Sequence, residues 1–152
     1  MTKFERDIVR SFNKFFEQSQ TDAIAYRIKQ HRFSSQVLDV LVDSSQDDYY
    51  LGIECKSISN KTGALYFTQH FGSDQIERID DFLRRSGRKG ILAVELRYGK
   101  GKPMRAHIIK WKDLKTRYLA KRVGFTVEEL MHFPQIKRTG RNYVIDAQLW
   151  TE

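Results

Sequence analysis

The sequence predicts an α/β protein in which a mixed central β-sheet is flanked by helices. Short apolar runs with strand-like composition alternate with segments whose apolar residues recur at helical spacing. The expected element order, α-β-β-β-α-β-β, indicates such a mixed sheet. A chain of 152 residues is long enough for one domain with a core of strands and helices. We therefore expect a single domain without a disulfide framework.

The first expected helix covers residues 4–17, and Thr2 and Glu5 can form a capping box at its start. Its apolar residues at helical spacing are Phe4, Ile8, Val9, Phe12 and Phe16. A strand over residues 23–28 follows, and residues 30–36 then predict a loop.

A β-hairpin is predicted by two short apolar runs, residues 37–42 and 51–56, with polar residues between them. If its turn is centred between Gln46 and Asp47, Asp39 lies directly opposite Glu54, with Cβ atoms about 5 Å apart. Side chains alternate along a strand, so Lys56 shares the face of these carboxylates. The opposite, core face is expected to hold Leu38, Val40, Val42, Leu51, Ile53 and Cys55.

In the middle of the chain, residues 59–72 are predicted to form a long loop. Loops of this length between regular elements are often functional. Ser73 is expected to cap a helix that runs through Arg85 and stops at Gly87. Strands are expected over residues 91–96 and 105–111, the second being the last strand of the sheet.

The final third predicts shorter elements. Residues 111–123 and 126–131 favour helices, the second opened by a capping box of Thr126 and Glu129. Gly140 is expected to turn a short terminal hairpin.

The charge balance favours a polyanionic partner. Lysine and arginine number 27 against 19 acids, which gives a net charge of +8, and nucleic acid is the first candidate. Charge alone does not separate a nuclease from a passive binder. The single cysteine, Cys55, fits a reducing cytoplasm. The sequence has neither a membrane-spanning run nor the apolar core of a signal peptide, so we expect a cytoplasmic protein without a membrane partner.

Asp39, Glu54 and Lys56 suit the hydrolysis of a phosphodiester. Two opposed carboxylates repel each other, and a divalent cation such as Mg²⁺ relieves that repulsion by taking oxygen ligands from both. The backbone carbonyl of Cys55 can add a ligand, and Lys56 can orient water or neutralise developing charge. Mn²⁺ is a possible substitute for Mg²⁺. The alternative is an ordinary solvated polar face of the hairpin.

Asp39 followed by Glu54-Cys55-Lys56 resembles the PD-(D/E)XK nuclease superfamily, especially the archaeal-type Holliday junction resolvases, over about residues 4–112. Leu38 stands where the motif's name has proline. The resemblance implies a restriction-endonuclease-like fold, to which residues 113–152 add a small basic helical and hairpin extension. It also implies a homodimer.

Two further residues share this resemblance. Glu5, in Phe4-Glu5-Arg6-Asp7, is similar to the family's glutamate that helps hold the metal, often through water; its role in the capping box is the alternative. Gln75 is similar to the glutamine near the catalytic lysine, and otherwise is a polar residue in a first helical turn. Residues 67–79 are also similar to the Gram-positive bacterial resolvases.

The expected DNA contacts lie around the first strand and the hairpin. Arg27 and Ser34 or Ser35 resemble the arginine and serine that contact the DNA backbone in the family, although this chain has Phe33-Ser34-Ser35 where a glycine-bearing loop is usual. We expect Lys29, Arg32 and Lys61 to contribute to the same surface.

The function that these features imply is a metal-dependent, structure-selective DNA endonuclease that resolves four-way junctions. One alternative is a restriction-type or repair nuclease of the same superfamily, and another is a non-catalytic basic DNA-binding protein on this fold. The four histidines show no zinc-like spacing, and we assign them no chemistry.

Overall fold

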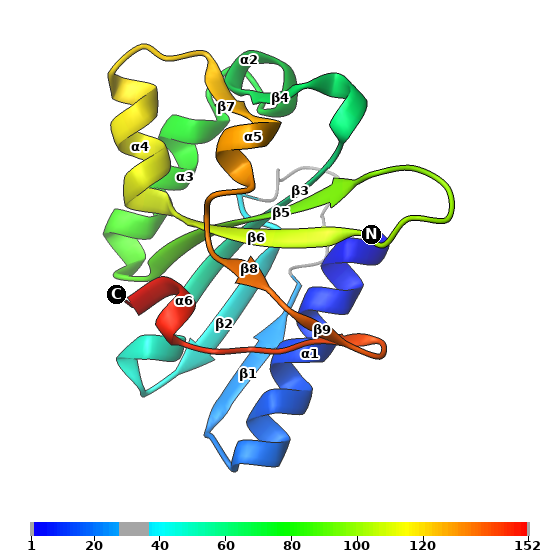
Figure 1. The fold of residues 1–152 in the computed structure, drawn as a ribbon. Helices are drawn as coiled ribbons and strands as arrows, with labels where there is room; N and C mark the ends of the chain where they lie inside the picture. Colours follow the sequence, from blue (N-terminus) through cyan, green and yellow to red (C-terminus); the bar gives the residue numbers. More distant parts are fainter. Residues whose placement is uncertain (1, 28–36, 152) are drawn as a thin grey trace.

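A computed structural model of the chain describes residues 2–27 and 37–151. Its centre is a six-stranded sheet in the order β1-β2-β3-β5-β6-β8 (Figure 1). These strands are β1 (Ala23–Tyr26), β2 (Val40–Ser44), β3 (Leu51–Ser59), β5 (Lys89–Arg97), β6 (Arg105–Lys110) and β8 (Gln135–Ile136). Strands β3 and β5 pair in parallel and the other neighbours are antiparallel. The predicted mixed sheet flanked by helices is confirmed.

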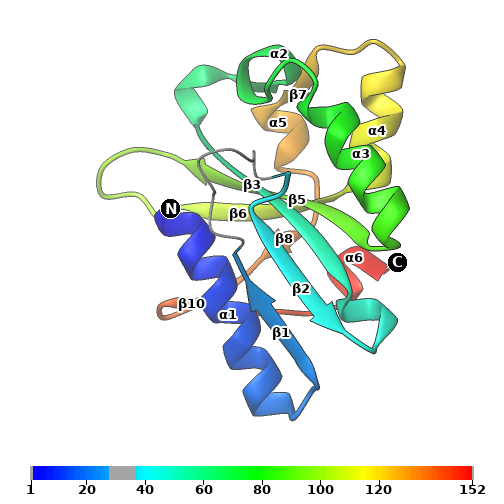
Figure 2. The same ribbon diagram turned by 180° about the vertical axis from the view of Figure 1, so that it is seen from behind.

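Helices cover both faces of this sheet (Figures 1 and 2). The helix α1 (Lys3–Ser19) packs on one face together with the C-terminal segment, and α3 (Gln75–Ser86) and α4 (Trp111–Leu119) pack on the other. The shorter elements are η1 (Asp47–Tyr49), η2 (Asn60–Thr62), β4 (Ala64–Tyr66), α2 (Phe67–His70), β7 (Gly124–Thr126), α5 (Val127–Leu130), β9 (Arg138–Thr139), β10 (Asn142–Tyr143) and α6 (Gln148–Thr151). No helix in the described ranges is long and apolar enough to cross a bilayer.

The helix termini mostly follow their sequence signals. The Thr2 hydroxyl accepts a hydrogen bond from the Glu5 N–H, and Thr126 and Glu129 form the complete capping box. Gly87 ends α3 with a φ of 76°, a left-handed conformation that favours glycine. Ser73 is not the cap of α3, because the helix begins at Gln75 and Asp74 precedes it without a side-chain cap bond.

Strand pairing over long sequence separations corrects two expectations, and the end of one helix corrects a third. The loop expected over residues 59–72 contains β4, which pairs with β7 in a separate small sheet. The strand β6 is not the last strand, because β8 pairs with its outer side. The helix expected over residues 111–123 ends at Leu119, where the chain turns toward β7. The hairpin at Gly140 is confirmed as β9 and β10.

The register of the first hairpin is the predicted one. Val40 pairs with Ile53, and Leu41 pairs with Gly52. Continued by one residue, this register sets Asp39, which directly precedes β2, opposite Glu54.

The assignment of hairpin faces was partly wrong. Val40, Val42 and Ile53 do pack on the α1 side. However, Leu38 packs with Leu41 in the cluster beneath α3, because the regular alternation of β2 begins only at Val40. The face that carries Glu54 is therefore a second apolar core with charges inside it, rather than a solvated polar face.

Gly52 allows α3 to approach the hairpin closely. A Cβ atom at this position would lie 2.6 Å from Leu38 Cδ1 and 2.9 Å from Leu83 Cδ2, which is closer than carbon atoms can pack. Leu38 adjoins Asp39 in sequence, and Leu83 belongs to the helix that carries Gln75. The absence of a side chain at Gly52 thus lets the Leu38 and Leu83 side chains pack directly against the backbone of β3.

Hydrogen bonds close the outer edge of β1. The Asn13 side chain on α1 donates to the Ala25 carbonyl and accepts from the Ala25 N–H, both at 2.9 Å. The Ala23 N–H donates to the Thr21 carbonyl at 3.0 Å. Backbone groups that would otherwise face outward are therefore paired within the chain.

We expect Gly52→Ala to destabilise the protein by about 1–3 kcal/mol, since the added methyl group must displace Leu38 or α3. Urea unfolding measures this loss. Gly72→Ala is the matched control, because its Cβ would approach only Gln75, at an ordinary 3.7 Å. Equal stability of the two variants would contradict the close packing described at Gly52.

Candidate active site

Asp39 and Glu54 bring two carboxylates together at one end of the first hairpin. Asp39 is the residue directly before β2. Its Oδ2 accepts a hydrogen bond from the Cys55 N–H at 2.9 Å. Glu54 lies on β3 and is only 2% exposed. A carboxylate this deeply buried beside another one carries a large electrostatic cost unless it is neutralised.

Two side chains contact Glu54 Oε2. The Lys56 Nζ lies 3.1 Å from this oxygen, and the Gln75 Nε2 donates a hydrogen bond to it at 2.8 Å. The other end of the Gln75 amide accepts a hydrogen bond from the Gly72 N–H at 3.0 Å. Gln75 therefore ties the first turn of α3 and the preceding segment to Glu54, and its amide cannot rotate without losing one of these bonds.

The surroundings of Glu54 favour its neutral form. Burial raises the pKa of Glu54 to about 8, and the charge of Asp39 adds to this rise while Lys56 opposes it. Glu54 therefore keeps a proton through neutral pH until a cation takes the place of that proton. Such competition between a proton and a cation is the expected behaviour of a metal-ligating carboxyl group.

Lys56 is held by an aromatic ring that the sequence did not single out. Its Nζ lies 4.5 Å from the centroid of the Phe71 ring, within the range of a cation–π contact, and its side chain is 18% exposed. The ammonium group is thus fixed between Phe71 and Glu54 while it remains accessible to a substrate. The only sequence signal for Phe71 was an aromatic residue within a segment predicted to be a loop.

The donor set fits a hard divalent cation. Asp39, Glu54 and the Cys55 carbonyl offer only oxygen atoms, which Mg²⁺ and Mn²⁺ prefer. Burial raises the pKa of the Cys55 thiol, so the side chain stays neutral and only its backbone is available. Over residues 2–27 and 37–151, no three His, Cys, Asp or Glu side chains converge in an arrangement that could hold a metal ion. A cation here would complete its coordination with water.

Glu5 has a different partner in this structure. The Arg27 guanidinium lies 3.0 Å from Glu5 Oε2, as an ion pair without hydrogen-bond geometry. Both side chains are largely buried, with 10% of Glu5 and 23% of Arg27 exposed. A role for Glu5 in holding metal through water stays a prediction, and Arg27 would have to reach DNA while paired with it.

The expected DNA contacts are only partly described. Lys61 is exposed on η2, where it can meet a phosphate. Lys29, Arg32, Ser34 and Ser35 lie outside the described residues. Arg27 is the last described residue before that gap.

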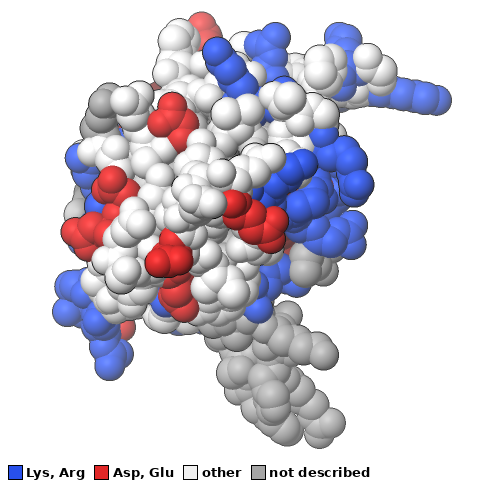
Figure 3. All heavy atoms as spheres, turned by 90° about the horizontal axis from the view of Figure 1, so that it is seen from below, with Lys and Arg blue, Asp and Glu red and all other residues white. Residues whose placement is uncertain are grey.

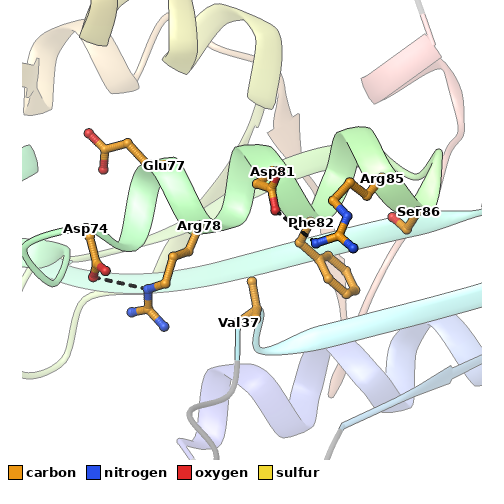
Figure 4. Close-up of a pocket in the computed structure, with 8 residues that line it drawn as sticks. All are labelled: Val37, Asp74, Glu77, Arg78, Asp81, Phe82, Arg85 and Ser86. Carbon is orange, nitrogen blue, oxygen red and sulfur yellow. Dashed lines mark hydrogen bonds and ion pairs between the residues drawn. The ribbon is translucent and has the colours of Figure 1, made fainter.

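A cavity of about 660 Å³ lies along the outer side of α3 rather than over the carboxylates (Figure 4). Val37 and Phe82 face each other across it. Its charged residues are three acids and two arginines: Asp74, Glu77, Asp81, Arg78 and Arg85. Ion pairs join Asp74 to Arg78 and Asp81 to Arg85. This balance of charge does not favour a nucleic-acid phosphate in that cavity.

No protein-family model matches this sequence, and no curated protein matches it. Among solved structures, the chain is similar to Hjc, a Holliday junction resolvase from the archaeal hyperthermophile Archaeoglobus fulgidus. The two share 19% sequence identity with a TM-score of 0.43, and the match covers 93% of this chain and 89% of that chain. A similarity of this size carries no argument about function, which must come from the residues of the site.

The raised pKa of Glu54 makes a stability prediction for the metal-free protein. In the unfolded chain Glu54 loses its proton near 4.5, whereas in the folded chain it keeps the proton to about 8. The contribution of Glu54 to the free energy of unfolding is therefore fully present below pH 4.5. It declines as pH rises toward 8, by up to about 1.4 kcal/mol per pH unit.

Urea unfolding in EDTA between pH 5 and 8 measures this decline. Glu54→Gln removes the titrating group and keeps the shape, so its stability is expected to fall less over the same range. Identical pH dependence in the two proteins would show that Glu54 is not the buried acid responsible.

Proposed function

We propose that this protein is a metal-dependent, structure-selective DNA endonuclease that resolves four-way junctions by paired phosphodiester hydrolysis. The observation that carries the proposal is the opposition of the half-buried Asp39 and the buried Glu54, with Lys56 Nζ 3.1 Å from Glu54 Oε2. A protein that only bound DNA would gain nothing from burying one carboxyl group beside another. The resemblance of the motif to the archaeal-type resolvases supports the choice of substrate.

The residues divide the chemistry between them. Asp39, Glu54 and the Cys55 carbonyl would hold Mg²⁺ or Mn²⁺, which when bound supplies Lewis acidity toward the phosphate. Gln75 keeps Glu54 Oε2 directed by donating to it at 2.8 Å. Lys56 donates a hydrogen bond to the attacking water or neutralises the charge that develops on the phosphate. Arg27 and Lys61 would bind neighbouring phosphates, and Glu5 would act through water.

A homodimer fits this activity. Resolution requires one nick in each of two opposed strands, and two symmetry-related sites on one particle can make both. Contacts to phosphates rather than bases would give shape preference with little sequence preference. A restriction-type or repair nuclease would use the same site, so the two proposals differ only in the DNA that is cut.

Cleavage of a labelled four-way junction beside a linear duplex of the same sequence tests the function. With Mg²⁺ we expect paired symmetric nicks in the junction alone. EDTA should abolish them, because it removes the cation. Asp39→Asn should lower the rate about a hundredfold or more, because it removes one of the charged ligands of the cation. Equal cutting of both DNAs would reject junction selectivity, and tight binding without cutting would reject the enzyme.

A comparison of two lysines separates chemistry from binding. We expect Lys56→Ala to slow single-turnover cleavage at saturating DNA by about 10²-fold or more, with little change in affinity. Lys61→Ala removes the same charge from an exposed position and should weaken binding while leaving the saturated rate intact. A rate loss of the same size in both variants would argue against a direct role for Lys56 in the reaction.

A further inference from the structure

A second cavity, of about 470 Å³, lies at the opposite end of α3 from Gln75. Its walls come from the end of α3, the start of β5, the end of β6, the start of α4 and α6. Six basic residues line it: Arg84, Arg88, Lys89, Lys110, Lys112 and Lys115. Asp80 is the only acid among its lining residues. Seen from below, lysines and arginines also lie at the margins of the molecule, with acids between them (Figure 3).

Most of these basic groups are already paired. Acidic partners lie within 4 Å of four of them, in the pairs Arg84–Asp81, Arg88–Asp43, Lys89–Asp48 and Lys115–Asp80. Lys110 and Lys112 have no acidic partner among the described residues. The cavity therefore keeps an excess positive charge from two neighbouring lysines.

The start of α4 adds to this positive potential. Lys110 precedes the helix and forms no side-chain cap bond, so first-turn N–H groups beside the cavity lack a side-chain acceptor from the cap position. The amino end of a helix carries partial positive charge, and Lys110 and Lys112 lie on either side of its first residue. Together they give this end of the cavity a positive potential, which Asp113 in the first turn of α4 partly offsets.

The two tryptophans that line the cavity limit the kind of ligand that it can bind. Trp111 and Trp150 are each only 5% exposed. Their indole N–H groups are occupied, by Asp80 and by the Asp48 carbonyl. No ring face is open for a base to stack on, so the cavity suits the charged backbone of a nucleic acid and not its bases.

We propose that this cavity binds a backbone phosphate of the same DNA that the candidate active site cuts. This inference rests on the proposed endonuclease function. Gln75 and Arg84 are nine residues apart on α3, which at 1.5 Å per residue places their backbones about 14 Å apart along the helix axis. A cavity at that separation, with room for a sugar–phosphate unit, fits a continuous DNA strand better than a free phosphate ion.

Tryptophan fluorescence reports directly on this cavity, because both tryptophans of the chain line it. In an Asp39→Asn background, which keeps the DNA intact, we expect added four-way junction to change the emission in a saturable way. Lys110→Gln with Lys112→Gln should remove most of this change and weaken DNA binding about 5- to 10-fold. It should also reduce the salt slope of binding by about 1 to 2, because two phosphate contacts are lost.

The matched control is Lys100→Gln with Lys102→Gln, which removes the same charge from exposed positions between β5 and β6. This control should keep the fluorescence response. Equal weakening of binding in both double variants would overturn the proposal, since the effect would then follow from total charge. Inorganic pyrophosphate is the second probe, and a response to it as strong as that to DNA would replace the backbone phosphate with a free anion as ligand.

Cleavage assays separate this proposal from the function on which it rests. With Asp39 present, the Lys110 and Lys112 double variant should cut at the wild-type rate when DNA is saturating. Cleavage by wild type with no fluorescence response to DNA would overturn the cavity assignment and leave the endonuclease standing. A fluorescence response to DNA from wild-type protein that cuts no DNA would instead overturn the endonuclease and leave DNA binding by the cavity standing.

Discussion

The placement of a buried carboxyl group, Glu54, beside the half-buried carboxylate of Asp39 is the constraint on which the surrounding structure depends. Each neighbour of the pair reduces its cost: Lys56 by charge, Gln75 and the Cys55 N–H by hydrogen bonds. These partners come from two elements, β3 and α3, so their positions require α3 to lie close to the hairpin. Gly52 permits that approach. The packing of α3 against the hairpin therefore also positions the groups of the candidate site.

Local patterns predicted most of the fold, and long-range pairing supplied several of the errors, beside the cap of α3 and the face of Leu38. The position of one turn was enough to predict the register that places Asp39 opposite Glu54, because the turn of a hairpin fixes the alignment of its two strands. The strands β4, β7 and β8 are two or three residues long. Their pairing depends on where distant segments pack, and a segment that short carries no readable period.

The candidate site was predicted to a similar extent. Glu54, Lys56 and Gln75 are charged or polar residues in distinctive contexts, and the structure brings them together around one oxygen. Phe71 and Gly52 went unnoticed because an aromatic ring and a glycine gain their roles only from what packs against them. Glu5 shows the reverse case, since its sequence context suggested a ligand and its contact in the fold is Arg27.

The side chain of Asn13 at the edge of β1 has a consequence for how copies of this chain associate. Its amide, with the Thr21 carbonyl, occupies the hydrogen-bonding groups that an added strand would need. A strand added at Ala25 would first have to displace both bonds to Asn13. A single asparagine thereby makes the β1 edge a poor template for edge-to-edge aggregation, while the opposite edge of this sheet is the two-residue strand β8.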